Sequence, residues 1–160
     1  MQLTTRFLGG SILNWKLKKF NELSTEELYK IIRLRIEVFV IEQNSIYQDC
    51  DGRDINAYHL FLEEESDIIA CLRILDKGVL FDEVAIGRVI VKKAYREKGI
   101  AREMLIKAIK HIEEIMQETS IRISAQAHLE KFYNSVGFKK VSAMYLEDNI
   151  PHVQMLYSKK

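Results

Sequence analysis

The sequence predicts an α/β domain built on one sheet of mixed strand direction. Three observations lead to this fold class. Short β-rich runs outnumber helical segments, helical patterns fall between strands in both halves of the chain, and a single proline, Pro151, interrupts the 160 residues. With 48% of its residues apolar, a chain of this length can bury one core, so we expect one domain rather than two.

Strand and helix signals alternate in the first half of the chain. Residues 13–20 are expected to form a strand. Ser24 and Glu27 then have the spacing of a capping box, in which two side chains satisfy backbone N–H groups reciprocally, so a helix should begin here. A polar, turn-rich connection spans residues 42–56, and connections of this length are more often functional than merely tolerated.

The second half is expected to begin with a hairpin. Residues 58–62 and 68–75 flank a short acidic turn, and residues 84–91 form a further β-rich run. Apolar side chains at helical spacing predict a long amphipathic helix from Ile100 to Met116. The remaining expected elements are a short strand (121–124), a short helix (129–136) and two closing strands (138–145 and 152–157).

Residues 1–11 are set apart from this domain. They end in Gly9-Gly10-Ser11, a flexible composition, and they lack an apolar stretch of signal-peptide length. We expect a flexible tail or a non-native remnant here, with a single domain over residues 12–160.

Composition excludes several classes of function. The 24 Lys and Arg nearly balance the 23 Asp and Glu, which argues against a nucleic-acid-binding protein. No run reaches the roughly 18 apolar residues of a membrane span. Cys50 and Cys71 lack the spacing of a disulfide framework or a zinc site. These features predict a cytoplasmic protein with no metal and no membrane or nucleic-acid partner.

The most informative segment, residues 89–102, has the pattern of a strand, a basic connection and a helix entered through Gly99. A helix N-terminus leaves backbone N–H groups unpaired and carries partial positive charge, so it suits an anion such as a pyrophosphate. Gly99 has no side chain where a phosphate would approach, and Ala101 keeps the next turn open. On its own, such a turn is more often an ordinary helix start. Its basic residues are Arg96, Lys98 and Arg102.

Two motifs resemble those of the GCN-type N-acetyltransferase (GNAT) superfamily. Arg96-Glu97-Lys98-Gly99-Ile100-Ala101 is similar to its Arg/Gln-x-x-Gly-x-Gly/Ala signature, and residues 124–138 are similar to its second segment, ending in Phe132-Tyr133-x-x-x-Gly137-Phe138. The resemblance implies a mixed, mostly antiparallel sheet of six to seven strands flanked by about four helices. Further segments (34–43, 47–54, 86–89 and 147–152) resemble the ElaA-like subgroup, so that the similarity covers almost everything from Trp15 to Met155.

This resemblance implies that an acetyl group moves from acetyl-CoA to a primary amine by direct attack in a ternary complex. In the family, backbone amides of the turn hold the pyrophosphate, and the preceding strand pairs with the pantetheine arm. A tyrosine, here Tyr133, donates a proton to the leaving thiolate. Gln126 stands where many relatives have Asn. The implied cofactor-binding residues are Val89, Ile90, Val91, Arg96, Glu97, Lys98, Gly99, Ile100, Ala101, Arg102, Gln126 and Tyr133.

The resemblance also places the acceptor beneath the first helices and the 42–56 connection. Acidic residues there, Glu42, Asp49, Asp51 and Asp54, would favour a cationic amine. A base must take a proton from the ammonium before attack. Glu42 is the leading candidate for this catalytic role, ahead of His152 and His128. The expected acceptor-side residues are Glu42, Gln43, Asp51 and His152, and Arg88 is expected to pair with one of the acids.

Two alternatives compete with catalysis. The chain could be an acyl-CoA-binding sensor without turnover, although the presence of Tyr133 argues against this. It could also be an interaction domain that uses the basic face over residues 92–102, although the near-zero net charge argues against that. For the enzyme, we expect a small-molecule or peptide amine as acceptor and a monomer or homodimer as the assembly.

Overall fold

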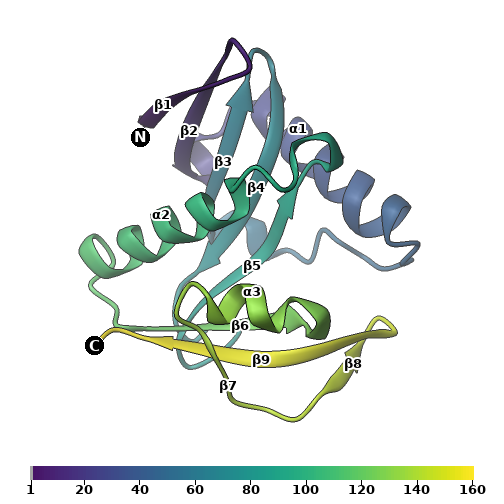
Figure 1. Cartoon of the computed structure of the whole chain (residues 1–160), viewed down its shortest axis with the longest axis vertical. Coiled ribbons are helices and arrows are strands. Elements are labelled where there is room, and N and C mark those ends of the chain that lie inside the picture. Colours follow the sequence, from purple (N-terminus) through teal and green to yellow (C-terminus); the bar gives the residue numbers. More distant parts are fainter. Residues whose placement is uncertain (1) are drawn as a thin grey trace.

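The computed structural model describes residues 2–160, with side chains from Leu8 onward. Within this range nine strands form one sheet in the order β1-β2-β3-β4-β5-β6-β9-β7, and β8 pairs with β9 (Figure 1). Only β5 and β6 are parallel neighbours; the other described pairs are antiparallel. The predicted mixed, mostly antiparallel α/β fold is confirmed.

The element counts differ from the expectation. The described chain has more strands than the six to seven expected and three α-helices rather than about four, because short 3-10 and π-helical turns replace further α-helices. The strands are β1 (Gln2–Leu8), β2 (Ser11–Lys19), β3 (Tyr58–Glu64), β4 (Asp67–Leu75), β5 (Val84–Val91), β6 (Ser120–Gln126), β7 (Lys139–Lys140), β8 (Tyr145–Glu147) and β9 (Ile150–Ser158). The α-helices are α1 (Thr25–Arg35), α2 (Ile100–Glu114) and α3 (Glu130–Asn134).

The N-terminal segment contributes a strand. Gly9 and Gly10, at φ 57° and 92°, form the turn of a hairpin in which β1 pairs antiparallel with β2. A two-residue turn with both φ angles positive matches the twist of antiparallel strands, and glycine adopts it without steric cost. The structure therefore has a strand where the sequence predicts a flexible tail, and the domain boundary at residue 12 stays a prediction.

Helix α1 starts at the predicted capping box. Glu27 N donates to Ser24 Oγ (3.0 Å), and Ser24 N donates to Glu27 Oε2 (2.9 Å). The helix then widens into a π-helical segment, Ile36–Glu42, whose Val38 joins the same buried cluster as Ile90 of β5. This segment explains why the apolar pattern continues past the last α-helical turn.

The two long helices cover opposite faces of the sheet (Figure 1). Alternate residues of β4 point to opposite faces: Cys71 joins the cluster formed by α1, which includes Leu34, whereas Leu72 joins the larger cluster formed by α2, which includes Met104. On the sheet side of α2, the ring of His111 meets Tyr58 edge-on with centroids 4.9 Å apart. Both ring nitrogens of His111 are buried, with no hydrogen-bond partner among the described residues.

Strands β5 and β6 separate soon after they meet. They pair only at Val84–Ile121 and Ala85–Arg122. A bulge follows in β5, because the register against β4 shifts between Cys71 and Arg73, and Arg88 there has φ 55°. Bulges bend a strand and increase its local twist. Beyond the bulge, β5 runs toward α2 while β6 runs toward α3, so the sheet opens between them.

The C-terminal strands are more irregular than expected. The single strand predicted over residues 138–145 is wrong: the structure has the two-residue β7, an irregular stretch and the short β8. Asp148 and Asn149, at φ 49° and 63°, form a tight turn that brings β8 back onto β9.

Among the helices of the described chain, none is long and apolar enough to cross a membrane.

Candidate active site

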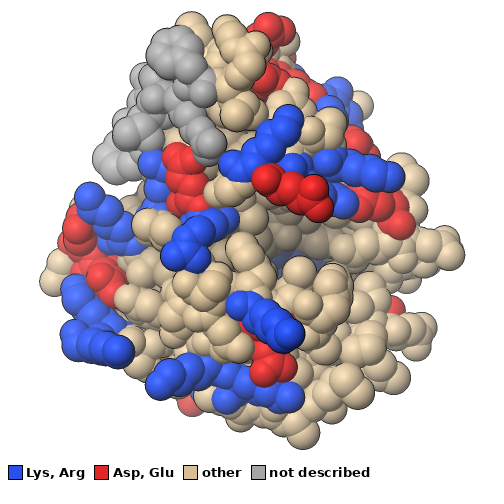
Figure 2. Space-filling model, viewed as in Figure 1, with Lys and Arg blue, Asp and Glu red and all other residues tan. Residues whose placement is uncertain are grey.

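A cavity of about 820 Å³ lies where β5 and β6 separate. Its walls come from the end of the first helix, strand β5, the start of α2, strand β6, α3 and the β8–β9 turn. Figure 2 shows a hollow on this face of the molecule. The cavity therefore collects segments that are far apart in sequence, as a two-substrate site requires.

The start of α2 presents backbone N–H groups to this cavity. Gly99, at φ 77°, is the N-cap, and no side chain caps the helix. The first intrahelical bond runs from Glu103 N to Gly99 O (3.1 Å), which leaves the amides before Glu103 as the unpaired donors of a helix start. A Cβ added to Gly99 would meet nothing within 4 Å. This open, positively polarised helix end fits a pyrophosphate group.

Most predicted cofactor-binding residues line the cavity. Lys98 is the exception: its ammonium donates to Ala94 O (3.1 Å) and lies over the ring of Tyr95 at 5.2 Å. The lining residues are Val89, Ile90, Val91, Arg96, Glu97, Gly99, Ile100, Ala101, Arg102, Gln126 and Tyr133. Arg96 and Arg102 also donate to the backbone, so the two arginines are partly fixed by Val91 O and Ser135 O.

Tyr133 lies deep in the cavity wall and is 6% exposed. Its ring packs edge-on against Phe132 and Phe138 at 5.2 and 5.9 Å. The predicted helix end is confirmed, because Gly137 has φ 99° and Phe138 N donates to Tyr133 O (3.1 Å). Burial raises the pKa of the Tyr133 phenol, so the hydroxyl carries its proton at neutral pH.

Two polar contacts connect the first helix to the cofactor side of the cavity. Arg96 Nη1 donates to Glu42 Oε1 at 2.5 Å, and Gln126 Nε2 donates to Gln43 Oε1 at 3.1 Å. The hydrogen bond and charge of Arg96 lower the pKa of the Glu42 carboxyl. A lower pKa makes Glu42 a weaker base, since the pKa of an efficient base lies near the working pH.

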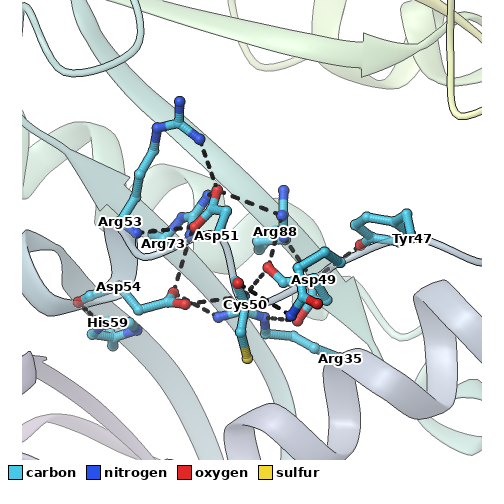
Figure 3. A network of polar contacts seen from close by, with 11 residues as sticks. Arg35, Tyr47, Asp49, Cys50, Asp51, Arg53, Asp54, His59, Arg73 and Arg88 are labelled. Carbon is cyan, nitrogen blue, oxygen red and sulfur yellow. Dashed lines mark hydrogen bonds and ion pairs between the residues drawn. The ribbon is translucent and has the colours of Figure 1, made fainter.

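Asp49 is bound between two arginines inside the protein. It is 5% exposed and accepts from Arg35 Nε and Arg88 Nε, each at 2.8 Å (Figure 3). Tyr47 OH donates to the same carboxylate at 3.0 Å. The expectation that Arg88 pairs with an acid of the connection is confirmed, and the pair joins α1, the connection and the β5 bulge.

Asp51 and Asp54 are also bound by arginines. Arg73 donates to Asp51 through Nη1 and Nη2, both at 2.8 Å, and to Asp54 through Nη1 at 3.1 Å. Burial alone would raise the pKa of Asp51, but the bonds from Arg73 and the Arg53 backbone lower it. Asp51 is not among the residues that line the cavity. The structure therefore does not bring Asp51 to the predicted acceptor position.

His152 faces the cavity from β9. Its Nδ1 lies 2.7 Å from Ile150 O. Because a carbonyl oxygen only accepts, Nδ1 must carry a proton, and Nε2 is the nitrogen that accepts one in the neutral ring. His128 also lines the cavity, from the turn before α3.

Several lining residues have no signal in the local sequence. Ser124 Oγ donates to Glu147 Oε2 (2.7 Å) and lies 2.5 Å from Tyr145 OH. These side chains meet because Tyr145 is the cross-strand partner of His152, a register that the sequence does not reveal. Arg73 was equally hidden, since its position opposite Gly87 depends on the bulge in β5. Only the pairing register of the strands places Arg73 and the Ser124–Glu147 pair at the cavity.

The fold and this cavity define a class of protein. The sequence profile of the Acetyltransferase (GNAT) domain matches residues 21–159, and the chain belongs to the GNAT acetyltransferase family. The resemblance drawn from the two sequence motifs is thereby confirmed.

Individual relatives are similar over nearly their whole length. ElaA of Escherichia coli strain K12 is 36% identical over 146 residues, 90% of this chain and 95% of ElaA. A Schizosaccharomyces pombe protein is 37% identical over 147 residues, 91% of this chain and 97% of its own. Both similarities extend well beyond the cofactor motifs.

Crystal structures of two relatives have the same fold. An acyl-CoA N-acyltransferase from Pseudomonas aeruginosa has a TM-score of 0.85 at 38% identity, and Escherichia coli ElaA has a TM-score of 0.84 at 37% identity. Each comparison covers 90% of this chain and 99% of the other. The predicted similarity to the ElaA-like subgroup is confirmed.

Replacement of Asp49 tests whether the arginine network supports the fold. We expect Asp49→Ala to lower the free energy of unfolding by about 3–5 kcal/mol, because it leaves two guanidinium groups near each other without their shared carboxylate. Urea denaturation measures this loss. Asp76→Ala, at an exposed carboxylate, is the control and should change stability by less than about 0.5 kcal/mol. Equal effects of the two substitutions would contradict the assignment.

Proposed function

We propose that the protein transfers the acetyl group of acetyl-CoA to a primary amine of a small molecule or peptide. One observation carries the proposal: the uncapped start of α2 and the buried hydroxyl-bearing Tyr133 line the same cavity. The first suits the pyrophosphate of the coenzyme, and the second suits the sulfur that leaves. Membership of the GNAT family supports the same reaction.

In the proposed reaction the amine nitrogen attacks the thioester carbonyl carbon. An N–C bond forms, the C–S bond breaks, and the sulfur takes the proton of the Tyr133 hydroxyl. The ammonium gives one proton to a base before the attack, the nitrogen loses a second proton to solvent as the amide forms, and the Tyr133 phenolate regains its proton from solvent. The edge of β5 that separates from β6 offers main-chain donors to the carbonyl oxygen as charge develops there. The residues proposed for these steps all line the cavity.

Two residues compete for the role of base. Glu42, the leading candidate from sequence, is held by Arg96 and has a lowered pKa. His152 has an accepting Nε2, because its other nitrogen donates to Ile150 O. We therefore favour His152 as the base and Glu42 as a group that orients Arg96 and the first helix.

The state of the two cysteines bears on the location of the protein. Cys50 and Cys71 are both free thiols, which supports a cytoplasmic location.

A sensor that binds acyl-CoA without turnover would not need a proton donor buried beside the cavity. Tyr133 therefore favours an enzyme over a sensor.

The coenzyme site is tested at Gly99. Gly99→Glu places a negative side chain at the start of α2, so we expect calorimetry to detect no binding of acetyl-CoA. Gly10→Glu is the matched control, because Gly10 also has a positive φ and open space but lies in the β1–β2 turn. Binding that survives Gly99→Glu would contradict the assignment.

The proton donor is tested by removing one hydroxyl. We expect Tyr133→Phe to lower kcat about 100-fold or more while the KM for acetyl-CoA changes only a few-fold. Tyr157→Phe serves as control, because that hydroxyl bonds to Glu113 on another surface. Thiol release measures both rates. Unchanged turnover in Tyr133→Phe would remove its role as acid.

The two candidate bases are separated by matched amide substitutions. If His152 is the base, His152→Gln lowers kcat about 100-fold or more. Glu42→Gln then acts mainly on the KM for acetyl-CoA, because it frees Arg96. The opposite pattern would restore Glu42 to the catalytic role.

A further inference from the structure

The acidic residues near the acceptor end do not leave it negatively charged. The carboxylates of Asp49, Asp51 and Asp54 are all engaged by arginines. Four arginines contact these three carboxylates, so the network carries one surplus positive charge (Figure 3). The network therefore has a net positive charge rather than the negative charge that the connection suggests in sequence, and two of its arginines, Arg73 of β4 and Arg88 of β5, line the cavity.

Two guanidinium groups of this network, those of Arg73 and Arg88, line the cavity. Arg73 is 3% exposed, and its Nε is buried without a hydrogen-bond partner among the described residues. Arg88 uses Nε and Nη2 on Asp49, while Nη1 has no partner in the part of the chain that the structure describes. Because Arg73 Nε has no exposed surface, the donor that a ligand in the cavity can reach is Nη1 of Arg88, whose side chain is 21% exposed.

The two guanidinium groups are neighbours. Both approach Asp51, Arg73 at 2.8 Å and Arg88 at 3.7 Å. The ring of Tyr47 lies 5.6 Å from the Arg88 guanidinium carbon and supports it from one side. The free Nη1 of Arg88 and the positive charge of Arg73 therefore belong to one region of the cavity wall, which suits the negative charge of a carboxylate.

The space beside these arginines is open. Gly87 is the cross-strand partner of Arg73, and a Cβ added to it would meet nothing within 4 Å. Gly87 also lines the cavity. A small anionic group can therefore approach the guanidinium groups along the sheet surface without displacing a side chain.

The other side of the acceptor end has the opposite character. Glu147 and Asp148 line the cavity from the β8–β9 turn, and no cation of the described chain forms an ion pair with either. His152, the proposed base, lies on the same side. This arrangement suits an ammonium group that is about to lose its proton.

We propose that the acetyl acceptor is an amino acid or a similar small molecule that carries a carboxylate beside its primary amine. Arg88 binds the carboxylate, with the positive charge of Arg73 beside it, and the Glu147 side of the cavity receives the amine. This inference rests on the proposed function, since it assigns the acceptor of the same reaction. It differs from the cationic acceptor that the acidic connection alone would predict.

The acceptor class is tested with matched compounds. Each common amino acid is offered beside its α-carboxamide and the amine without the carboxyl group, and a polyamine represents cationic acceptors. Thiol release from acetyl-CoA is measured as kcat/KM. We expect at least one amino acid to be used about 10- to 100-fold better than its carboxamide, since a charged hydrogen-bonded group is lost in the amide.

Two variants connect that preference to the arginines. Arg88→Met keeps the aliphatic stem and should reduce the acid-over-amide preference to about 1, whatever its effect on the fold through the lost bond to Asp49. Gly87→Val fills the open space on a strand that accepts β-branched residues, and should raise the KM for the amino acid about 10-fold or more. A merely structural loss would lower the rates with acid and amide equally.

The outcomes distinguish the two levels of proposal. Absence of acetyl-CoA binding would reject the proposed function itself. Binding of acetyl-CoA with faster turnover of carboxamides or polyamines, or with no amino acid used, would reject the carboxylate site and leave the proposed function standing. An acid preference that persists in Arg88→Met and Gly87→Val would also reject this site.

Discussion

The separation of β5 from β6 is the constraint on which the rest of the site depends. Parallel strands that stayed paired would fill the space between them with backbone hydrogen bonds, and no cavity would form. The pairing ends after two residue pairs, and the bulge at Arg88 that follows bends β5 away from β6. It leaves one edge of β5 available to a ligand, and it brings the start of α2 and the face of α3 to the same opening.

That bulge has a cost that other contacts offset. A non-glycine residue at positive φ is strained by about 1 kcal/mol or more. Arg88 is held there by Asp49, which Arg35 of α1 also binds. The buried ion network thus fixes the shape of the sheet as well as the path of the connection. Its pairs need not increase stability greatly, because desolvation offsets much of their attraction.

Local chemistry explains what the sequence predicted well. The Ser24–Glu27 box, the run of residues 84–91 and the glycine at the start of α2 each depend on neighbours within a few residues. The failures involve partners that are distant in sequence. Asp51 looks like a surface charge until Arg73 of β4 is placed against it, and the approach of Glu147 to Ser124 needs the strand register.

The N-terminal hairpin shows a related limit. Gly9 and Gly10 suggest flexibility by composition, yet the same pair forms a tight turn when flanked by strands. Glycine lowers the cost of both outcomes, so the residue type cannot decide between them. The pairing partner, β2, decides it in the structure.

The histidine on the sheet side of α2, His111, makes the stability of the folded chain sensitive to acid. Burial lowers the pKa of His111 from the usual value near 6.5. As the medium becomes more acidic than that value, the unfolded chain takes up a proton at this ring more readily than the folded chain, and the folded state loses stability. The helix whose first turn lines the cavity is thus weakened from its inner side under mild acidification.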